Sequence, residues 1–476
     1  MVILEIRGHS FAYEMECVAR LFYPGEKIQI IREGEQSPEA DGSLWLTAAL
    51  APCPEGCRAT AAVSGEGYRG ECSTDLPADT PEQEQERALA VLLFQQLAKA
   101  TGQRPPWGVL TGVRPVRLCR AMMAGGLDEQ GVFRRLTEDY LVRPEKASLA
   151  LETGRVQEPI LADCPANAYH LYISIPFCPS RCLYCSFVSH EIEKCAKLIP
   201  DYVELLCREL REIARVATQK GLLLQTVYIG GGTPTTLSAA DLSRILAEVE
   251  ASFDLSAVTE FTVEAGRPDT ITAEKLAALK EHGVDRVSIN PQTMEDRVLA
   301  AIGRKHTAAQ TVESFHMARE AGFEWINMDL IAGLPGDSDR GFLDTVDKVL
   351  ALSPENITIH TLTVKRSSRL REQEWAFDES DMELGACLDE ARRRLSAHGY
   401  LPYYMYRQKG TKQNLENIGF SKPGYESPYN IFIMEEVRSV LAAGAGGVTK
   451  ICGAGGDIRR VYNFKYPYEY QSRFDE

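Results

Sequence analysis

Residues 175–187 read Ile-Pro-Phe-Cys-Pro-Ser-Arg-Cys-Leu-Tyr-Cys-Ser-Phe and follow a β-rich run. The stretch holds three cysteines, Cys178, Cys182 and Cys185. A 4Fe–4S cluster needs four ligands, and cysteine thiolates are its usual protein ligands. Three thiolates this close can each bind one iron, which leaves the fourth iron without a protein ligand. Because an open coordination position is typical of a metal site that performs chemistry, the stretch predicts a reactive 4Fe–4S cluster.

The open iron suits the amino and carboxylate groups of S-adenosylmethionine (SAM), and an electron passed into the sulfonium would release a 5′-deoxyadenosyl radical. The cysteine spacing, with Tyr184 just before the last cysteine, resembles that of the radical SAM superfamily. A zinc site and three buried free thiols are the alternatives. Zinc motifs usually need a second ligand pair, and Cys53 and Cys57, in a Pro/Gly turn, have no further ligands nearby. The pattern therefore favours a cluster.

The composition narrows the class of protein. The chain has 476 residues, a net charge of −15 and a pI near 5.2. Its length exceeds the ~250–300 residues at which single cores stop growing, so we expect two or three domains. The acidic balance argues against nucleic acid as a partner. With no secretory signal and no apolar stretch near the ~18 residues of a membrane span, we expect a cytoplasmic protein whose clustered cysteines bind metal.

From about residue 170, short β-rich runs alternate with amphipathic stretches, which predicts βα units and a parallel sheet. The predicted strands are 170–177, 226–230, 260–264, 286–290, 326–331 and 356–363. The predicted helices are 191–218, 239–251, 273–282, 307–321 and 341–352. About six such units favour an α/β fold with a partial (β/α)6 barrel over residues 166–375. Barrels of this type carry the active site at the C-terminal ends of their strands, where the cysteines fall.

The pattern of β-like runs and helices in residues 1–165 predicts an N-terminal α+β domain. Its β-like runs are 2–7, 17–22, 27–32, 43–49 and 60–63. A helix at about 81–100, a Pro/Gly/Arg loop at 105–117 and further helices to about residue 156 follow. The loop suits contacts with an anionic substrate or a partner, and it suits domain packing equally well.

Residues 376–476 predict a C-terminal α+β extension that covers the substrate. It holds a helix at about 381–398, a tyrosine-rich run at 403–406 and a Gly/Ala stretch at 442–456.

Glycines and polar residues follow the other predicted strands. Gly230–Pro234 ends the second strand, and consecutive glycines let the backbone approach a ligand with no Cβ in the way. Glu264 closes the third strand, where its carboxylate suits ribose hydroxyls, and Gln292 and Arg304 follow the fourth. Asp329 lies inside the apolar fifth strand, where an acid is costly unless it is partnered. Placed on one rim, these residues form a candidate cofactor site.

The order of these motifs resembles the oxygen-independent coproporphyrinogen III oxidases over about residues 170–450. The motifs are Tyr172-x-x-Ile-Pro-Phe-Cys178, the cysteine triad, Gly-Gly-Gly-Thr-Pro, Glu264, Ser288-Ile-Asn-Pro-Gln292, Gly303-Arg304-Lys-His306 and Asp329-Leu-Ile-Ala-Gly-Leu-Pro-Gly336. With its N-terminal domain and the loop from Trp107 to Arg117, the chain resembles the HemZ branch of this family.

The resemblance implies a role for each matching residue. Cys178, Cys182 and Cys185 would bind the cluster. The residues around SAM would be Tyr172, Tyr184, Gly231, Gly232, Thr233, Glu264, Gln292, Arg304 and Asp329. Tyr172 and Arg304 would also take part in catalysis.

The implied reaction converts substrate propionates to vinyl groups. The deoxyadenosyl radical takes a hydrogen from the propionate β-carbon, CO₂ and one electron leave, and two rounds give protoporphyrinogen IX. The tetrapyrrole carries four carboxylates, so cations should meet it; the candidates are Lys365, Arg366, Arg407, Lys409 and Lys412. The electron that starts the reaction would come from flavodoxin or ferredoxin.

Two positions depart from the family pattern. Ser174 stands where the oxidases carry histidine, and Phe187 stands where they carry a fourth cysteine. Neither change threatens the cluster, but both lie near the expected cavity and bear on the substrate. The main alternative is a haem-binding chaperone of the same family, for which His190, His360 and Tyr404 are candidate axial ligands. A radical enzyme acting on RNA is disfavoured by the acidic charge.

Overall fold

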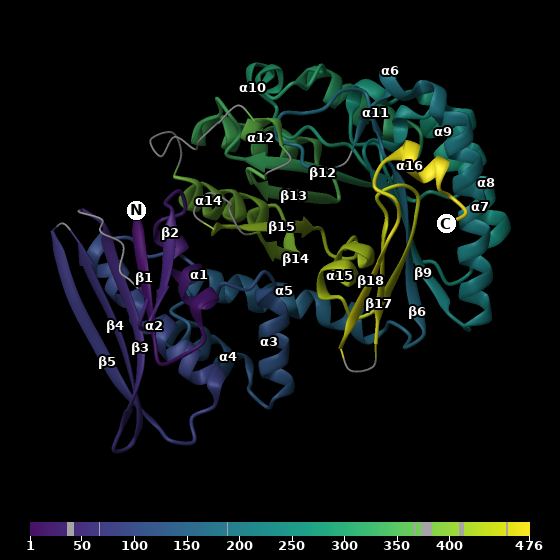
Figure 1. Cartoon of the computed structure of the whole chain (residues 1–476). Helices are drawn as coiled ribbons and strands as arrows, with labels where there is room; N and C mark the ends of the chain where they lie inside the picture. The colour runs from purple at the N-terminus through teal and green to yellow at the C-terminus, as the bar shows by residue number, and fades with distance from the viewer. Residues whose placement is uncertain are drawn as a thin grey trace. The chain divides into compact units, whose positions relative to one another are not determined.

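The computed structural model describes residues 1–35, 42–65, 67–187, 189–365, 368–372, 383–408, 414–453 and 456–476 (Figure 1). The chain divides into two compact units. The first contains Met1–Leu151 together with Arg407–Leu415, and the second contains Glu152–Tyr406 together with Glu416–Glu476.

The first unit is built on a five-stranded sheet in the order β2-β1-β3-β4-β5. The strands are β1 (Val2–Arg7), β2 (Ile28–Arg32), β3 (Leu44–Cys53), β4 (Gly56–Gly65) and β5 (Tyr68–Pro77). Helix α1 (Ala12–Phe22) lies between β1 and β2, and α2 (Glu82–Thr101) follows β5. Leu89, Leu93 and Leu97 recur every four residues along α2 and are fully buried, which places this face of the helix in the core of the unit.

One predicted strand of this unit is wrong. The run 17–22 lies in helix α1, whose buried residues Met15, Val18, Ala19 and Phe22 follow helical spacing. The helical period is visible only when residues 12–16 are included, because the apolar run itself is too short to separate the two periodicities. The helices α3 (Pro115–Ala124) and α4 (Glu129–Arg134) follow, and α5 (Pro144–Ala162) begins in this unit and continues into the second.

The loop at 105–117 packs inside its own unit through Trp107. Trp107 is fully buried, and the Arg407 guanidinium lies 5.3 Å from the centre of its ring. Arg407 is itself buried and donates hydrogen bonds to the carbonyls of Leu110 and Asn414. Arg407 was a candidate for substrate contact, and these bonds commit its side chain to the packing of the loop instead.

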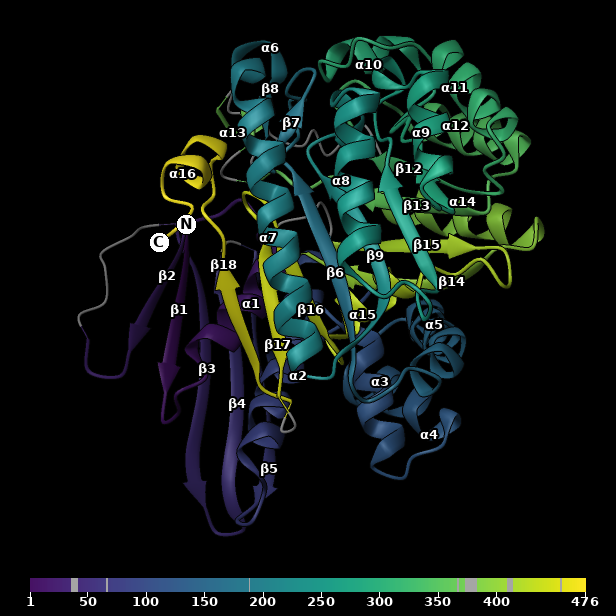
Figure 2. The same cartoon turned by 90° about the vertical axis from the view of Figure 1, so that its right-hand side faces the viewer.

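The second unit contains an eleven-stranded sheet in the order β14-β15-β13-β12-β11-β10-β9-β6-β16-β17-β18. Its centre consists of six strands that pair in parallel in chain order (Figure 2). These are β6 (Ala168–Ile175), β9 (Leu223–Gly231), β10 (Glu260–Glu264), β11 (Arg286–Ser288), β12 (Trp325–Ala332) and β13 (Asn356–Thr361). The prediction of an α/β fold with an open (β/α)6 arrangement is confirmed.

Helices alternate with these strands. They are α7 (Ile199–Gln219), α8 (Ala239–Ser252), α9 (Ala273–Glu281), α10 (Asp296–Ala301), α11 (Ala308–Glu320) and α12 (Asp339–Leu352). The short helix α10 was not predicted. Ser238, Thr272, Thr307 and Ser338 cap four of these helices through their side-chain oxygens. The caps fix where each helix begins and therefore the length of the preceding loop at the rim.

The C-terminal segment adds strands to both edges of the central sheet. After α14 (Leu384–Ala397), β14 (Leu401–Arg407) and β15 (Glu416–Ser421) extend the β13 edge, and β15 runs antiparallel to β13. After α15 (Pro428–Glu435), β16 (Ser439–Ala443) pairs in parallel with β6. The hairpin β17 (Val448–Cys452) and β18 (Ile458–Tyr462) follows, and α16 (Pro467–Ser472) comes last.

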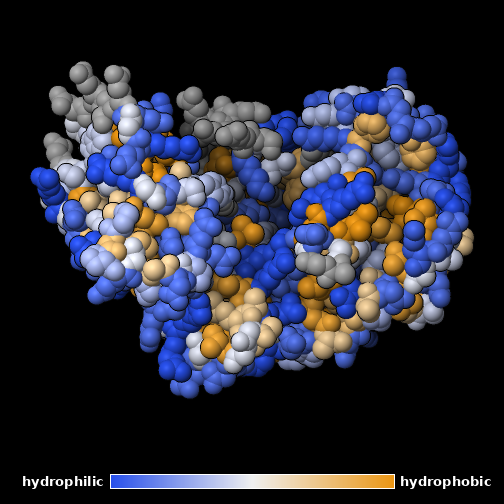
Figure 3. Space-filling view, turned by 60° about the horizontal axis from the view of Figure 1, so that its bottom comes forward, coloured by the Kyte–Doolittle hydropathy of each residue, from blue (hydrophilic) through white to orange (hydrophobic). Residues whose placement is uncertain are grey.

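The surface mixes polar and apolar side chains. On the face in Figure 3, apolar patches are separated by hydrophilic residues. Across the described residues, every helix is too short or too polar to traverse a lipid bilayer.

Candidate active site

The three cysteines lie in a loop that closes on itself at the end of β6. Cys178 ends the short strand β7 (Phe177–Cys178), which pairs in parallel with β8 (His190–Glu191). The His190 amide donates to the Pro176 carbonyl at 2.8 Å, and the Leu183 amide donates to the Ile302 carbonyl at 3.0 Å. The segment 176–191, here called the cysteine loop, is therefore attached at both ends and in the middle.

Cys182 is buried, Cys178 and Cys185 are partly buried, and two of the three thiols lie beside hydrogen-bond donors. Burial raises the pKa of Cys178, and burial together with the nearby Cys182 raises the pKa of Cys185 to about 11. Thr233 Oγ1 donates to Cys178 Sγ at 3.4 Å, and Arg267 Nη1 donates to Cys182 Sγ at 3.6 Å. Donors of this kind stabilise sulfur that carries negative charge. A bound metal centre would supply the remaining driving force for deprotonation.

The chemistry of the cysteine loop fits a cluster. Three cysteines on one loop, two of which accept hydrogen bonds from Thr233 and Arg267, match the ligand set of a 4Fe–4S cluster with one open iron.

The glycine turn after β9 lies directly against the cysteine loop. The Gly232 amide donates to the Ile175 carbonyl at 2.8 Å, and the Thr233 amide donates to the Phe177 carbonyl at 2.7 Å. A Cβ on Gly232 would lie 2.5 Å from the Phe177 carbonyl oxygen, and Gly231 has a φ of +110°. Both positions therefore require glycine, and this close approach is what places Thr233 on Cys178.

Two carboxylates on the same rim have opposite pKa shifts. Glu264 accepts a hydrogen bond from Tyr228 Oη at 2.6 Å, and burial raises its pKa to about 7, with a further contribution from the charge of Asp329. Burial also acts on Asp329, but His360 and Asn327 outweigh it and lower the pKa of Asp329. Asn327 Nδ2 donates to Asp329 at 2.8 Å. The acid inside the apolar strand is thus partnered.

Arg304 contacts Tyr184 of the cysteine loop, and Gln292 lies beside Asp329 on β12. Arg304 is buried and donates to the Asn290 carbonyl at 2.6 Å and to Tyr184 Oη at 3.2 Å. Gln292 has a φ of +68°, and its buried Oε1 has no hydrogen-bond partner among the described residues. A strained backbone and an unsatisfied buried amide oxygen are both costly and cluster at ligand sites. Both features therefore favour Gln292 as a ligand-binding residue.

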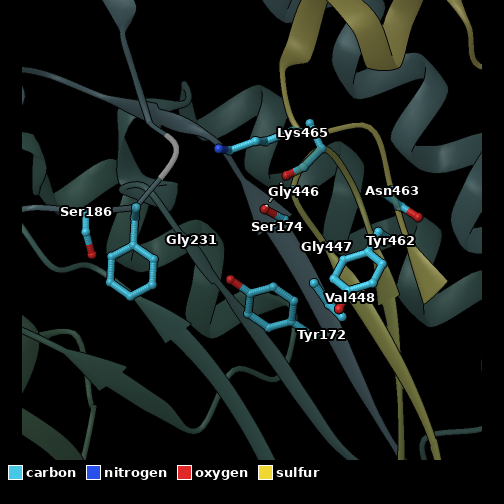
Figure 4. Close-up of a pocket in the computed structure, with 12 residues that line it drawn as sticks. Tyr172, Ser174, Ser186, Gly231, Gly446, Gly447, Val448, Tyr462, Asn463 and Lys465 are labelled. Atoms are coloured by element: carbon cyan, nitrogen blue, oxygen red, sulfur yellow. Dashed lines mark hydrogen bonds between the residues drawn. The ribbon is translucent and has the colours of Figure 1, made fainter. Parts of the chain in front are cut away.

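A cavity of about 350 Å³ opens beside the glycine turn (Figure 4). Of the predicted site residues, Tyr172 and Gly231 line it. The Tyr172 ring lies 6.3 Å from Tyr228 and 6.4 Å from Tyr429, in stacked geometry. Glu264, Gln292, Arg304 and Asp329 lie elsewhere on the rim and do not line this cavity.

Several residues of the site escaped the sequence analysis. Arg267 is three residues beyond Glu264 in the same loop, a position that a scan for charges on the rim would have found. Tyr228 and Tyr429 sit in ordinary apolar runs and carry no such signal. The residues Asn463 and Lys465, which line the cavity from the C-terminal segment, are more than 230 residues from the nearest barrel residue in the cavity wall.

The remaining candidates are more scattered. His190 lies on β8 beside the Tyr466 ring, His360 lies 3.9 Å from Asp329, and Tyr404 is buried. Lys365 lies in the segment after β13. Arg366, Lys409 and Lys412 fall outside the residues that the structure describes.

Comparison with known proteins gives consistent matches. The sequence model of the Radical SAM superfamily matches residues 172–349. The chain is 36% identical over 470 residues to the oxygen-independent coproporphyrinogen-III oxidase-like protein HemZ of Bacillus subtilis (strain 168), which covers 97% of this chain and 93% of that protein. It is 35% identical over 284 residues to the heme chaperone HemW of the same organism, over 58% of this chain and 70% of HemW.

A solved structure shares the fold. Coproporphyrinogen III oxidase (HemN) from Escherichia coli, described as a radical SAM enzyme, matches with a TM-score of 0.53 and 23% identity over 68% of this chain and 72% of that chain. The predicted cofactors, a 4Fe–4S cluster and SAM, follow from the superfamily. The chain therefore belongs to the radical SAM superfamily and, within it, to the oxygen-independent coproporphyrinogen III oxidase-like family of HemZ.

Proposed function

We propose that this chain oxidatively decarboxylates the propionates of coproporphyrinogen III to vinyl groups and so yields protoporphyrinogen IX. The observation that carries the proposal is the contact between Thr233 Oγ1 and Cys178 Sγ at 3.4 Å. It joins the glycine turn, suited to the amino and carboxylate groups of SAM, to the cysteine loop. A cofactor held by the turn would therefore lie against the open iron.

Each residue of the rim has a distinct proposed role. Cys178, Cys182 and Cys185 hold the cluster, which with SAM supplies a 5′-deoxyadenosyl radical when both are bound. Gly231, Gly232 and Thr233 present backbone to the methionine end of SAM. The ribose and adenine would be held by residues from the following strands: Glu264, Gln292, Arg304 and Asp329. Tyr172 and Tyr184 enclose the site with their rings, and Tyr172 also faces the cavity.

The proposed reaction balances as follows for each propionate. With the cluster and SAM bound, the radical chemistry that they supply would remove one hydrogen atom from the β-carbon of the propionate, and 5′-deoxyadenosine would be the by-product. The bond between the α-carbon and the carboxylate then breaks, CO₂ departs and a vinyl group remains. One electron is released to a one-electron acceptor. A low-potential donor of the flavodoxin or ferredoxin class supplies the electron that cleaves SAM.

The test uses the full chain with its cluster reconstituted without oxygen. The protein is incubated with SAM, a reductant and coproporphyrinogen III, and products are separated by chromatography. We expect CO₂, 5′-deoxyadenosine and a porphyrinogen with one and then two vinyl groups. SAM cleavage without any vinyl product would overturn the proposed substrate.

A haem chaperone is the second candidate, and the similarity to HemW supports it. In that case the protein would bind haem stoichiometrically and would leave coproporphyrinogen unchanged. His190 is the first ligand to test, because its Nε2 is buried and has no hydrogen-bond partner among the described residues. Titration of the protein with haemin, followed by its Soret absorbance, distinguishes the two functions.

A further inference from the structure

The cavity beside the glycine turn has an unusual wall. Twelve residues line it, among them Tyr172, Phe187, Gly231, Tyr462, Asn463 and Lys465. None of them is acidic, and Lys465 alone is charged. Phe187 and Tyr462 are 68% and 69% exposed. Exposed rings beside a single cation fit a ligand that is largely apolar and anionic at its edge.

Lys465 is available for such a ligand. Among the described residues, no carboxylate lies within ion-pair distance of its ammonium and no hydrogen bond engages it; the centre of the Tyr466 ring lies 5.6 Å away. Figure 4 shows the ammonium reaching across the cavity, away from the backbone of its own segment. Other lysines of this region are paired: Lys450, for example, lies 3.0 Å from Glu436.

The segment that carries Lys465 is fixed by the partly buried carboxylate of Glu209. We call residues 462–465 the C-terminal strap. Glu209 of α7 accepts hydrogen bonds from the Gly444 amide, from Asn463 Nδ2 and from Tyr470 Oη, each at 2.7 Å. Asn463 Nδ2 also donates to the Gly444 carbonyl at 3.0 Å. The strap is thereby tied to a rigid helix and holds Lys465 at a defined place.

Ser174 on β6 attaches the turn at 444–447, which follows β16, to the barrel. Its Oγ donates to the Ala445 carbonyl at 2.8 Å, and Tyr202 Oη bridges the Ser174 carbonyl and the Ala445 amide at 2.7 and 2.9 Å. A Cβ on Gly444 would lie 2.5 Å from the Ser174 carbonyl oxygen and 3.3 Å from the Ser174 Cβ. The small side chain at position 174 thus leaves room for the turn that brings the strap to the cavity.

We infer that the Lys465 ammonium binds a carboxylate of the tetrapyrrole substrate in this cavity, with Phe187 and Tyr462 against the macrocycle. This inference rests on the proposed function. Tyr172 and Gly231 form the barrel wall of the same cavity, so a carboxylate held by Lys465 lies opposite the expected SAM site. About 350 Å³ is at the lower end for small-molecule pockets, so the cavity accepts one propionate-bearing edge of the substrate.

The test measures binding of coproporphyrin III, a stable fluorescent tetracarboxylate, to the anaerobically reconstituted full chain. We expect Lys465→Met to raise the dissociation constant about fivefold, as for loss of one charged hydrogen bond in a partly exposed site. Lys465→Glu should raise it further, and Lys465→Arg should stay near the wild type. Lys220→Met, at an exposed lysine that ends α7, is the matched control. Cluster content and SAM cleavage without substrate should match the wild type in all variants.

The outcomes separate this inference from the function on which it rests. Equal affinity of the wild type, Lys465→Met and Lys465→Glu, with vinyl formation intact, would overturn the carboxylate site and leave the proposed function standing. Failure of the wild type both to bind coproporphyrin and to form vinyl product would overturn both. Graded loss of affinity from Arg to Met to Glu, reduced at high salt, supports the site.

Discussion

The cysteine loop and the C-terminal strap lie on the same cavity but are built differently. The cysteine loop uses neighbours in sequence: three thiols within one short stretch, closed by the pairing of β7 with β8. The strap depends on long-range bonds, such as that of Asn463 to Glu209, 254 residues away. The residues proposed to bind the cluster can therefore be recognised as a local sequence motif. The residues proposed to bind the substrate come together only in the folded chain. Substitutions in the two regions should therefore have different effects. Those in the cysteine loop should remove the cluster, and those that release the strap should lower stability.

The largest expected effect is in the cysteine loop. Cys182→Ala should abolish cluster absorbance and reduce SAM cleavage at least about a hundredfold, because a ligand of the cluster cannot be replaced by a methyl group. The free energy of unfolding of the metal-free protein should change little. Cys195→Ala, a cysteine just beyond the loop, is the control and should retain iron and cleavage. Iron analysis and 5′-deoxyadenosine formation measure the result; normal cleavage by Cys182→Ala would refute the assignment.

A substitution that removes the hydrogen bonds of the strap should instead lower the stability of the protein. Glu209→Ala removes the acceptor of three hydrogen bonds and leaves buried donors unsatisfied, so we expect a loss of about 3 kcal/mol in the free energy of unfolding. Hydrogen exchange should rise at 444–447 and 462–470 but not at β6. Glu212→Ala, an exposed glutamate on the same helix, should change stability by less than about 0.5 kcal/mol. Unchanged exchange in the strap would mean that Glu209 does not hold it.

This contrast explains how much could be predicted from sequence. The six central strands were found because buried parallel strands are short apolar runs separated by amphipathic helices. Helix α1 was misassigned because its apolar run spans fewer than two turns. The cysteines and the glycine turn were visible because their chemistry restricts residue type. Lys465 was not visible, because an exposed lysine in a C-terminal segment has no distinguishing pattern until the sheet brings it to β6.

A smaller effect is expected at Glu264, on the cofactor side. Its pKa is about 7 in the free protein, so the carboxylate that would accept ribose hydroxyls is mostly protonated below pH 7 and ionised above it. SAM affinity should therefore rise with pH, on the order of tenfold between pH 6 and pH 8. The ionisable groups around Glu264 are Tyr172, Tyr228, Tyr429, Asp329 and Arg286.

The matched variant for this effect is Glu264→Gln, which keeps the size of the side chain and cannot ionise. Its SAM affinity should not vary with pH over the same interval, while coproporphyrin binding at the strap stays as in the wild type. Isothermal titration calorimetry at pH 6, 7 and 8 measures both. If the SAM affinity of Glu264→Gln varied with pH as much as that of the wild type, the titrating group would be another residue. The experiment would then give no evidence that the cofactor site and the substrate site respond separately.

The smallest effect should come from Arg267, whose guanidinium donates to Cys182 Sγ at 3.6 Å while pairing with Asp269 at 2.8 Å. A donor and a positive charge beside a cluster thiolate favour the reduced, more negative cluster. Asp269 offsets part of that charge, so Arg267→Met should lower the reduction potential only on the order of tens of millivolts. Arg267→Lys, which keeps the charge, should lower it less.

Redox titration followed by electron paramagnetic resonance measures the potential independently of turnover. Coproporphyrin affinity should not change, because Arg267 does not line the cavity; an unaltered potential in Arg267→Met would show that the bond to Cys182 does not tune the cluster.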